Sequence, residues 1–219
     1  MSFDVLAPHY RWMEFVLAGE KLQRCRTAFL NQVQHCRNVL IVGEGNGRFL
    51  VECRRALTEA KFMCVDASKP MLELAKKRIE ATGRGTGAIE FVHADAALWR
   101  PQRQSFDLVV THFFLDCFRP EQLDRIVARL ADAARPDAAW LLADFQIPSR
   151  GIRRCRALVI HRLMYWFFRV VTRLPARHLT PVDPLLQKYG FRLRERSVCD
   201  WDLLHSDWWI RQTNQMSPP

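Results

Sequence analysis

Short apolar runs and amphipathic stretches alternate along the chain. Runs rich in β-branched and apolar residues predict five buried strands, over 38–43, 61–66, 89–94, 106–111 and 138–144. Apolar positions at helical spacing predict helices over 48–58, 69–82 and 120–134, and two late strands are expected near 191–198 and 208–213. This order predicts an α/β, Rossmann-like, doubly wound and mostly parallel sheet with helices on both faces. Its ligands are expected at the carboxyl ends of the strands.

The turn after the first predicted strand is rich in glycine. Gly43, Gly45 and Gly47 occupy every second position directly before a predicted helix, where bare backbone amides can meet a ligand. A tight turn between strand and helix explains the same pattern without a ligand. A dinucleotide fingerprint would need its last glycine where the chain has Arg48, so NAD is disfavoured.

Acids close the next two strands. Asp66 ends the second, about 20 residues after the glycine turn, where a carboxylate can accept hydrogen bonds from both hydroxyls of a ribose. Asp95 follows the third, where a carboxylate can accept from an adenine amine. With the glycine spacing and the run Asp-Ala-Ser-Lys-Pro-Met-Leu at 66–72, residues 37–145 resemble the class I S-adenosylmethionine-dependent methyltransferases. The runs at 7–12, 66–72 and 185–191 resemble the ubiquinone/menaquinone biosynthesis group within that family.

The resemblance implies S-adenosyl-L-methionine as cofactor, S-adenosyl-L-homocysteine as product and a C-terminal antiparallel β-hairpin. The cofactor contacts that it implies are Gly43, Gly45 and Gly47 along the methionine part, Asp66 at the ribose, Met71 near the adenine, Asp95 and Ala96 at the adenine edge, and Ala67 and Thr111 at the neighbouring strand ends. The family usually carries an acid two residues before the first glycine, where this chain has Ile41. We therefore hypothesise that Glu44 contacts the ammonium group of the cofactor, the alternative being a solvated loop acid.

The reacting positions are expected after the fourth strand. Transfer of a methyl group from a sulfonium is an in-line displacement that needs alignment and exclusion of water rather than a nucleophilic triad. His112 is a candidate general base toward a phenol or enol, because its ordinary pKa lies near neutrality, or it fills a polar gap at the strand end. Asp116 is expected to orient His112 or the substrate, or to cap the next segment. Tyr10 is expected in an N-terminal lid over the cofactor, or packed between the first helix and the core.

Positive charge concentrates after the fifth predicted strand. The chain has 33 Lys and Arg against 23 Asp and Glu, a formal charge of +10, and residues 145–182 include eight arginines and no acid. On a helical wheel Arg162 lies on the basic side of this segment, and Ile160 and Leu163 lie on its apolar side. Three interpretations follow: a lid helix with its apolar face over the substrate and its arginines in water, an interfacial helix on anionic lipid, or a nucleic-acid surface.

Composition limits the remaining choices. The seven cysteines are scattered without a CxxC pair, which indicates reduced thiols and no structural zinc. The N-terminus does not read as a signal peptide, so we expect a cytoplasmic protein with peripheral contact at the inner face of a membrane through 150–177. We interpret the residues between 200 and 207 as solvated acids of a turn and hairpin rather than metal ligands: Asp200, Asp202, His205 and Asp207.

We therefore expect one methyltransferase domain over 1–219. Its parts would be an N-terminal helical lid (1–36), a cofactor-binding core (37–145), a basic aromatic helical insert (146–182) and a C-terminal helix and hairpin (183–219). The expected reaction is O- or C-methylation of a hydrophobic small molecule, quinone-like or lipid, without a metal. The alternatives are methylation of RNA or another anionic acceptor, and a non-catalytic cofactor-binding or scaffold protein. The run Thr-His-Phe-Phe at 111–114 is unlike that of nucleobase amine methyltransferases, so nucleic acid is the disfavoured partner, and the sequence does not indicate an oligomeric state.

Overall fold

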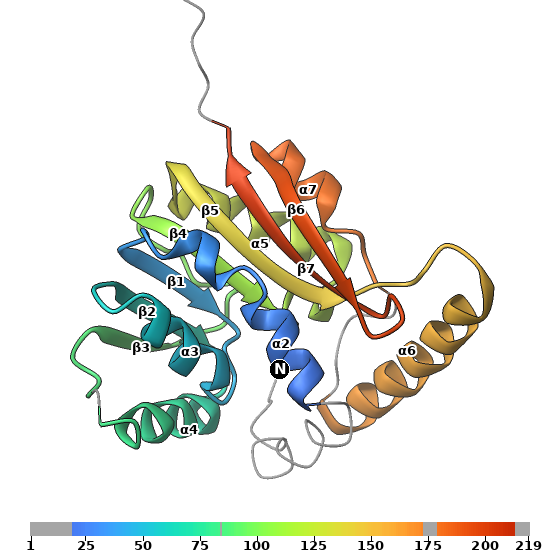
Figure 1. Cartoon of the computed structure of the whole chain (residues 1–219), viewed down its shortest axis with the longest axis horizontal. Coiled ribbons are helices and arrows are strands. Elements are labelled where there is room, and N and C mark those ends of the chain that lie inside the picture. Colours follow the sequence, from blue (N-terminus) through green and yellow to red (C-terminus); the bar gives the residue numbers. More distant parts are fainter. Residues whose placement is uncertain (1–18, 84, 173–178, 213–219) are drawn as a thin grey trace, which may run out of the picture.

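A computed structural model describes residues 19–83, 85–172 and 179–212. Its seven-stranded sheet has the order β3-β2-β1-β4-β5-β7-β6 (Figure 1). The strands are β1 (Asn38–Val42), β2 (Lys61–Asp66), β3 (Ile89–His93), β4 (Phe106–His112), β5 (Ala134–Phe145), β6 (Phe191–Cys199) and β7 (Leu204–Arg211). Strands β1 to β5 pair in parallel, whereas β7 runs antiparallel to both β5 and β6. The predicted α/β sheet with a C-terminal antiparallel hairpin is confirmed.

Helices cover both faces of this sheet. On one face lie α2 (Gly19–Thr27), α3 (Arg48–Ala56) and α4 (Lys69–Glu80), together with the short 3-10 helix η1 (Leu30–Val33) (Figure 1). The other face is covered by α5 (Pro120–Ala133) and α7 (Asp183–Lys188). The 3-10 helix η2 (Leu115–Cys117) follows β4, and the long α6 (Gly151–Thr172) follows β5 and projects from the side of the molecule.

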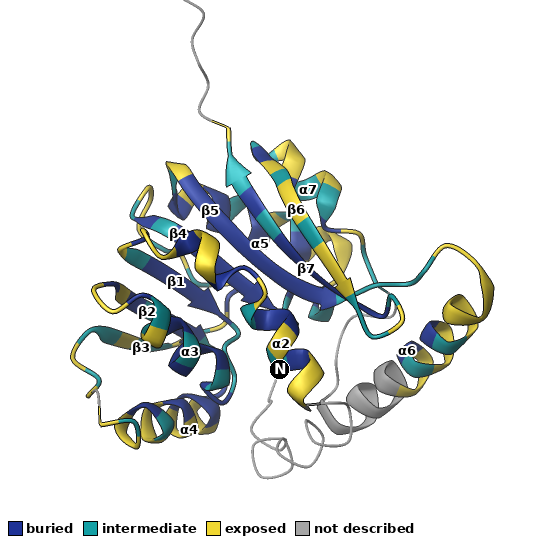
Figure 2. Ribbon diagram, in the orientation of Figure 1, coloured by how far each residue is buried: buried dark blue, intermediate teal, exposed yellow. Residues whose placement is uncertain are grey.

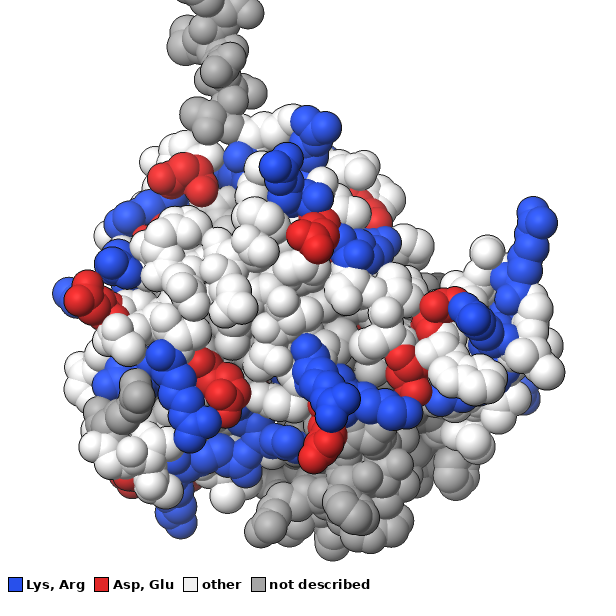
Figure 3. Space-filling model, in the orientation of Figure 1, with Lys and Arg blue, Asp and Glu red and all other residues white. Residues whose placement is uncertain are grey.

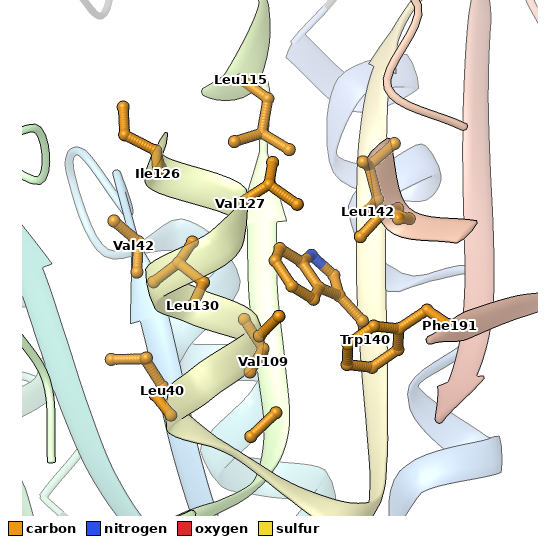
Figure 4. Close-up of a cluster of buried hydrophobic side chains, with 14 of the residues drawn as sticks. Leu40, Val42, Val109, Leu115, Ile126, Val127, Leu130, Trp140, Leu142 and Phe191 are labelled. Atoms are coloured by element: carbon orange, nitrogen blue, oxygen red, sulfur yellow. The ribbon is translucent and has the colours of Figure 1, made fainter. Parts of the chain in front are cut away.

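The alternation of strand side chains divides the core into two layers. Successive residues of a strand point to opposite faces, so Leu40 and Val42 pack toward α5 whereas Val39 and Ile41 pack toward α3. Strand residues at the middle of the sheet are buried almost without interruption (Figure 2). On the α5 face Trp140 is fully buried against Phe191, with ring centroids 5.2 Å apart (Figure 4). Both faces are therefore closed, and the strand ends remain as the place for a ligand.

Two strand starts differ from the prediction. β5 begins at Ala134 rather than at residue 138, because Ala134 already pairs with Phe106 across a bulge. β7 begins at Leu204 rather than at residue 208 and pairs with the end of β5. Its first half contains His205 and Asp207, which a search for apolar runs does not recognise as a strand. The end of this predicted strand at 213 lies outside the described residues.

Candidate active site

The order of the strands creates a switch point between β1 and β4. From β1 the chain proceeds outward to β2 and β3, and from β4 it proceeds the other way, so the connections at the carboxyl ends of β1 and β4 diverge. Open α/β sheets bind ligands in the crevice at such a point. The glycine turn after β1 and residues 112–118 after β4 both lie there. The candidate site is therefore built from these two connections and their neighbours.

The first glycine of the turn lies directly against an aromatic ring. Gly43 has a φ of 72°, and a Cβ built on it would lie 2.3 Å from Cδ2 and 2.8 Å from Cγ of Phe114. No side chain fits there unless Phe114 moves. The backbone N–H of Gly43 donates to the carbonyl oxygen of Val65 at 2.8 Å, which ties the turn to β2. Gly43 thus lets the segment after β4 approach the turn after β1.

The other two glycines have different roles. Gly45 has a φ of 67°, and its N–H donates to Oδ2 of Asp66 at 3.0 Å. Gly47 has a φ of 82°, and a Cβ on it would lie 2.7 Å from the Cα of Ala75 in α4. The absence of a side chain at Gly47 is thus explained by the packing of α3 on α4. Asp66 and the backbone of Gly45 form the part of the turn that faces the end of β2.

Asp66 is oriented by the backbone on both sides. Its Oδ1 accepts a hydrogen bond from the N–H of Ser68 at 2.8 Å, while its Oδ2 accepts from Gly45. Ser68 is the N-cap of α4, and its hydroxyl accepts from the N–H of Met71 at 3.4 Å. The carbonyl oxygen of Ala67 lies 3.0 Å from Nε2 of His93. The run at 66–72 thus contains the end of β2 at Asp66, the N-cap of α4 at Ser68 and the buried side chain of Met71.

Glu44 caps a helix. Its Oε1 accepts a hydrogen bond from the N–H of Leu50 at 3.0 Å, in the first turn of α3, whose N-cap residue Gly47 offers no side chain. Burial raises the pKa of Glu44 to about 7, although the hydrogen bond from Leu50 and the positive charge of Arg26 oppose the rise. Glu44 is half-buried at the start of α3 rather than a solvated loop acid. Its contact with a cofactor stays a prediction.

The residues expected at the adenine are partly exposed. Asp95 is exposed, and its Oδ1 accepts from the N–H of Ala97 at 2.8 Å. Ala96 next to it is buried against the α5 face of the core. Leu98 is among the exposed large apolar side chains of the protein. The connection after β3 therefore combines an exposed acid, an alanine buried in the core and an exposed apolar side chain near the end of the strand.

Thr111 and His112 end β4 and point to opposite faces. The hydroxyl of Thr111 accepts a hydrogen bond from Nε1 of Trp140 at 2.8 Å within the α5 layer. His112 is buried on the α3 face, with its ring edge-on to Phe49 at a centroid distance of 4.4 Å. Burial and then the charge of Arg26 hold the pKa of His112 well below its usual range, and neither ring nitrogen has a hydrogen-bond partner among the described residues. A base at His112 would thus be neutral, and this role stays a prediction.

Two carboxyl groups meet at the ends of β4 and β5. Asp144 is 3% exposed at the end of β5, and its Oδ1 accepts from the N–H of Phe145 at 2.8 Å. Burial raises the pKa of Asp116, in η2, to about 6. Burial and the neighbouring Asp116 raise the pKa of Asp144 well above its usual range. Both carboxyl groups therefore ionise at higher pH than exposed acids do. Sequence reasoning named Asp116 but missed Asp144, although an acid closing a parallel strand was the available signal.

Aromatic rings line the same strand ends. Phe113, at a φ of 51°, lies 5.2 Å from the ring of Phe145, and the guanidinium of Arg26 lies 5.2 Å from the Phe113 ring centroid. Phe114 lies 5.0 Å from Phe118. The ends of β4 and β5 thus combine an apolar aromatic wall with the Asp116 and Asp144 pair. Tyr10 lies outside the described residues.

The acids near the C-terminus are paired, which corrects the interpretation that they are solvated. Asp207 is fully buried, and both its oxygens accept from Arg196, at 2.7 Å from Nε and 2.6 Å from Nη2. Nδ1 of His205 lies 3.0 Å from the same carboxylate, and Arg196 also contacts Asp183 at 2.9 Å. Burial opposes ionisation of Asp207, but these hydrogen bonds keep its pKa below the ordinary value. Within the described residues there is no group of three or more His, Cys, Asp or Glu that could hold a metal ion.

The central segment of the chain is similar in sequence to known proteins. Residues 39–137 match the family of methyltransferase domains, a little under half of the chain. A curated relative, carboxy-S-adenosyl-L-methionine synthase from Desulfotalea psychrophila (strain LSv54 / DSM 12343), is 28% identical over 109 residues. The aligned region covers 49% of this chain and 43% of that protein, so the chain spans less than half the length of its curated relative.

Solved structures share the whole architecture. The mitomycin 7-O-methyltransferase superposes with a TM-score of 0.72 at 18% identity, covering 96% of this chain and 61% of that one. An N-methyltransferase from Bradyrhizobium japonicum WM9, solved with S-adenosyl-L-homocysteine, gives a TM-score of 0.63 at 13% identity, covering 87% of each chain. The fold is that of solved S-adenosylmethionine-dependent methyltransferases, and residues 39–137 match the methyltransferase-domain family in sequence.

Proposed function

We propose that the protein is an enzyme, an S-adenosylmethionine-dependent methyltransferase that acts on a hydrophobic small molecule, quinone-like or lipid, at oxygen or carbon. The observation that carries this proposal is the meeting of two connections at the switch point of the sheet. The glycine turn after β1, where Gly45 donates to Asp66, lies against the aromatic segment after β4. The matched methyltransferase domain and the shared fold support the class of reaction.

The residues of the turn fit such a cofactor. Gly45 has no side chain beside Asp66, and the carboxylate of Asp66 is already oriented at the end of β2 by the N–H groups of Gly45 and Ser68. In the proposal Asp66 accepts from the ribose hydroxyls, while Met71, Asp95 and Ala96 lie around the adenine. When bound, the cofactor supplies a methyl group on a sulfonium. The protein aligns the acceptor with this group and keeps water out. In favourable cases such alignment lowers the activation free energy by about 7–11 kcal/mol.

The acceptor side determines what can be methylated. Rings of Phe113, Phe114 and Phe145 offer an apolar surface at the ends of β4 and β5, which favours a hydrophobic acceptor over RNA. A phenol or enol has to lose a proton to be methylated, and Asp116, with a pKa of about 6, is a suitable acceptor of that proton at neutral pH. Asp116 is therefore our first candidate for the base and His112 the second.

Calorimetric titration tests the cofactor. We expect micromolar binding of S-adenosylmethionine and S-adenosylhomocysteine and none of NAD. Asp66→Asn should weaken binding at least tenfold, because an amide offers one acceptor oxygen instead of two. Glu73→Gln is the matched control, an exposed acid of α4 away from the turn. If neither sulfur nucleotide binds, the enzyme assignment is wrong. Binding without turnover on lipid extracts, quinones or RNA would instead favour a scaffold protein.

A further inference from the structure

Exposed apolar side chains gather on one side of α6. Ile152 is 77%, Val159 59% and Leu163 62% exposed. At 100° per residue these three positions lie within about 40° of one another, so they form a single line along the helix. The opposite side carries Ala157 and His161, which are buried toward the sheet. Leu163 thus faces outward, away from the side of α6 that carries Ala157 and His161.

A loop distant in the sequence extends this line. Trp201, 63% exposed, lies in the turn between β6 and β7, and the guanidinium of Arg156 lies 5.9 Å from its ring centroid. Two ion pairs hold the turn on α6, from Arg156 to Asp200 at 3.1 Å and from Arg153 to Asp202 at 2.8 Å. We call Ile152, Val159, Leu163 and Trp201 the apolar patch; it spans two elements that the sequence separates by about 40 residues.

The charge around the apolar patch is positive. Residues 150–163 include five arginines, Arg150, Arg153, Arg154, Arg156 and Arg162, and no acid. The neighbouring acids are neutralised, because Asp200 pairs with both Arg156 and Lys21 and Asp202 pairs with Arg153. Blue and white atoms accordingly cover the projecting part of α6 in Figure 3. Within the described residues no helix is long and apolar enough to cross a membrane.

We propose that the apolar patch and its arginines dock the protein on the surface of an anionic lipid membrane, with α6 lying in the interface. Aliphatic side chains in line, a tryptophan and flanking arginines are the composition of such helices. A second copy of this chain fits less well, because a self-complementary contact would bring like charges together. RNA fits less well too, since Trp201 is the only aromatic side chain of the patch and stacking requires several. The docking does not depend on the reaction proposed above.

Vesicle flotation of the full chain tests this proposal. We expect binding to vesicles of phosphatidylcholine with phosphatidylglycerol, little binding to phosphatidylcholine alone, and loss on raising the salt concentration. Val159→Ser/Leu163→Ser and Trp201→Ser should each lower the partition coefficient about tenfold or more, and Arg162→Gln about fivefold. Leu74→Ser is the matched control, since Leu74 is an exposed leucine of α4 outside the patch. Thermal melts of all variants establish that each is folded.

Three results would overturn the proposal. The first is absence of binding to anionic vesicles at low salt. The second is equal loss in Leu74→Ser and in the patch variants, which would mean that exposed leucine in general is responsible. The third is evidence that the patch binds another partner. This would be a dimer in solution that dissociates in Val159→Ser/Leu163→Ser, or a labelled RNA that binds the unmodified protein, but not these variants, while anionic vesicles do not bind.

Discussion

The contact between Gly43 and Phe114 makes a quantitative prediction about Gly43→Ala. Two costs add at this position. An L residue at a φ of 72° costs about 1–2 kcal/mol, because its Cβ crowds the following carbonyl. A methyl group 2.3 Å from Cδ2 of Phe114 must also displace the ring near its root, an overpacking that typically costs about 1–3 kcal/mol. We therefore expect Gly43→Ala to lower the free energy of unfolding by about 2–5 kcal/mol.

Gly190→Ala separates these two costs. Gly190 has a φ of 85°, yet a Cβ on it would meet nothing within 4 Å. Gly190→Ala should therefore lower the free energy of unfolding only by the backbone cost, about 1–2 kcal/mol. Urea denaturation of both variants, followed by circular dichroism, gives the difference that belongs to the contact with Phe114. The double variant Gly43→Ala/Phe114→Ala should lose about 1–3 kcal/mol less than the sum of the single variants, because the clash is absent.

One pattern of unfolding energies would contradict the contact between Gly43 and Phe114. Equal losses for Gly43→Ala and Gly190→Ala, together with additive effects in the double variant, would show that the Phe114 ring does not lie on Gly43 in solution. The junction between the turn after β1 and the segment after β4 would then differ from that described here. The same titrations with S-adenosylmethionine would show whether Gly43→Ala also weakens binding, as the proposed function requires.

Two further predictions concern buried charges. Arg196→Met should lower the free energy of unfolding by about 3 kcal/mol because it leaves the buried carboxylate of Asp207 without its main partner, whereas Arg194→Met, exposed on the same strand, should change it by less than about 0.5 kcal/mol in urea denaturation. Glu44 has a folded pKa of about 7, raised from 4.5, so its contribution to stability is complete below about pH 4.5 and is lost as pH rises through about 7. Glu44→Gln keeps an acceptor for the N–H of Leu50 and should remove up to about 3 kcal/mol of the change in unfolding free energy with pH. If the unfolding free energy of both proteins changes equally between pH 5 and 8, the raised pKa of Glu44 is wrong.

The sequence predicted what depends on local pattern. Apolar runs located the strands of the sheet apart from the first half of β7, and the glycine turn and Asp66 lie at the strand ends where they were predicted. The same approach missed features that depend on register. Asp207 looks like a solvated acid until the hairpin places Arg196 opposite it in β6. Asp144 becomes part of a pair only because η2 brings Asp116 to the end of β5.

Side-chain exposure on α6 could not be predicted for a similar reason. A helical wheel sorts residues into two sides but does not say which side meets the sheet. Both sides of α6 carry apolar side chains, with Ala157 on the buried side and Leu163 on the exposed one. Ala157 packs in one apolar cluster with Ala143 of β5 and Leu204 of β7. In the same orientation of α6, Asp200 and Asp202 of the turn between β6 and β7 pair with its arginines. These ion pairs join residues 44 and 49 positions apart, so they are not visible in a local pattern.

Ile41 and Glu44 show how an acid can leave its usual position in such a turn. Ile41 is buried in the layer under α3 together with Phe49, where a carboxylate would lack compensation. Glu44 instead reaches the first turn of α3, whose backbone N–H groups it satisfies. With a pKa of about 7, Glu44 is only partly ionised at neutral pH. If Glu44 also binds the ammonium group of the cofactor, the affinity for S-adenosylmethionine should rise as pH increases through about 7. Glu44→Gln should not show this rise. If it serves the helix alone, the affinity of the two proteins follows the same pH profile.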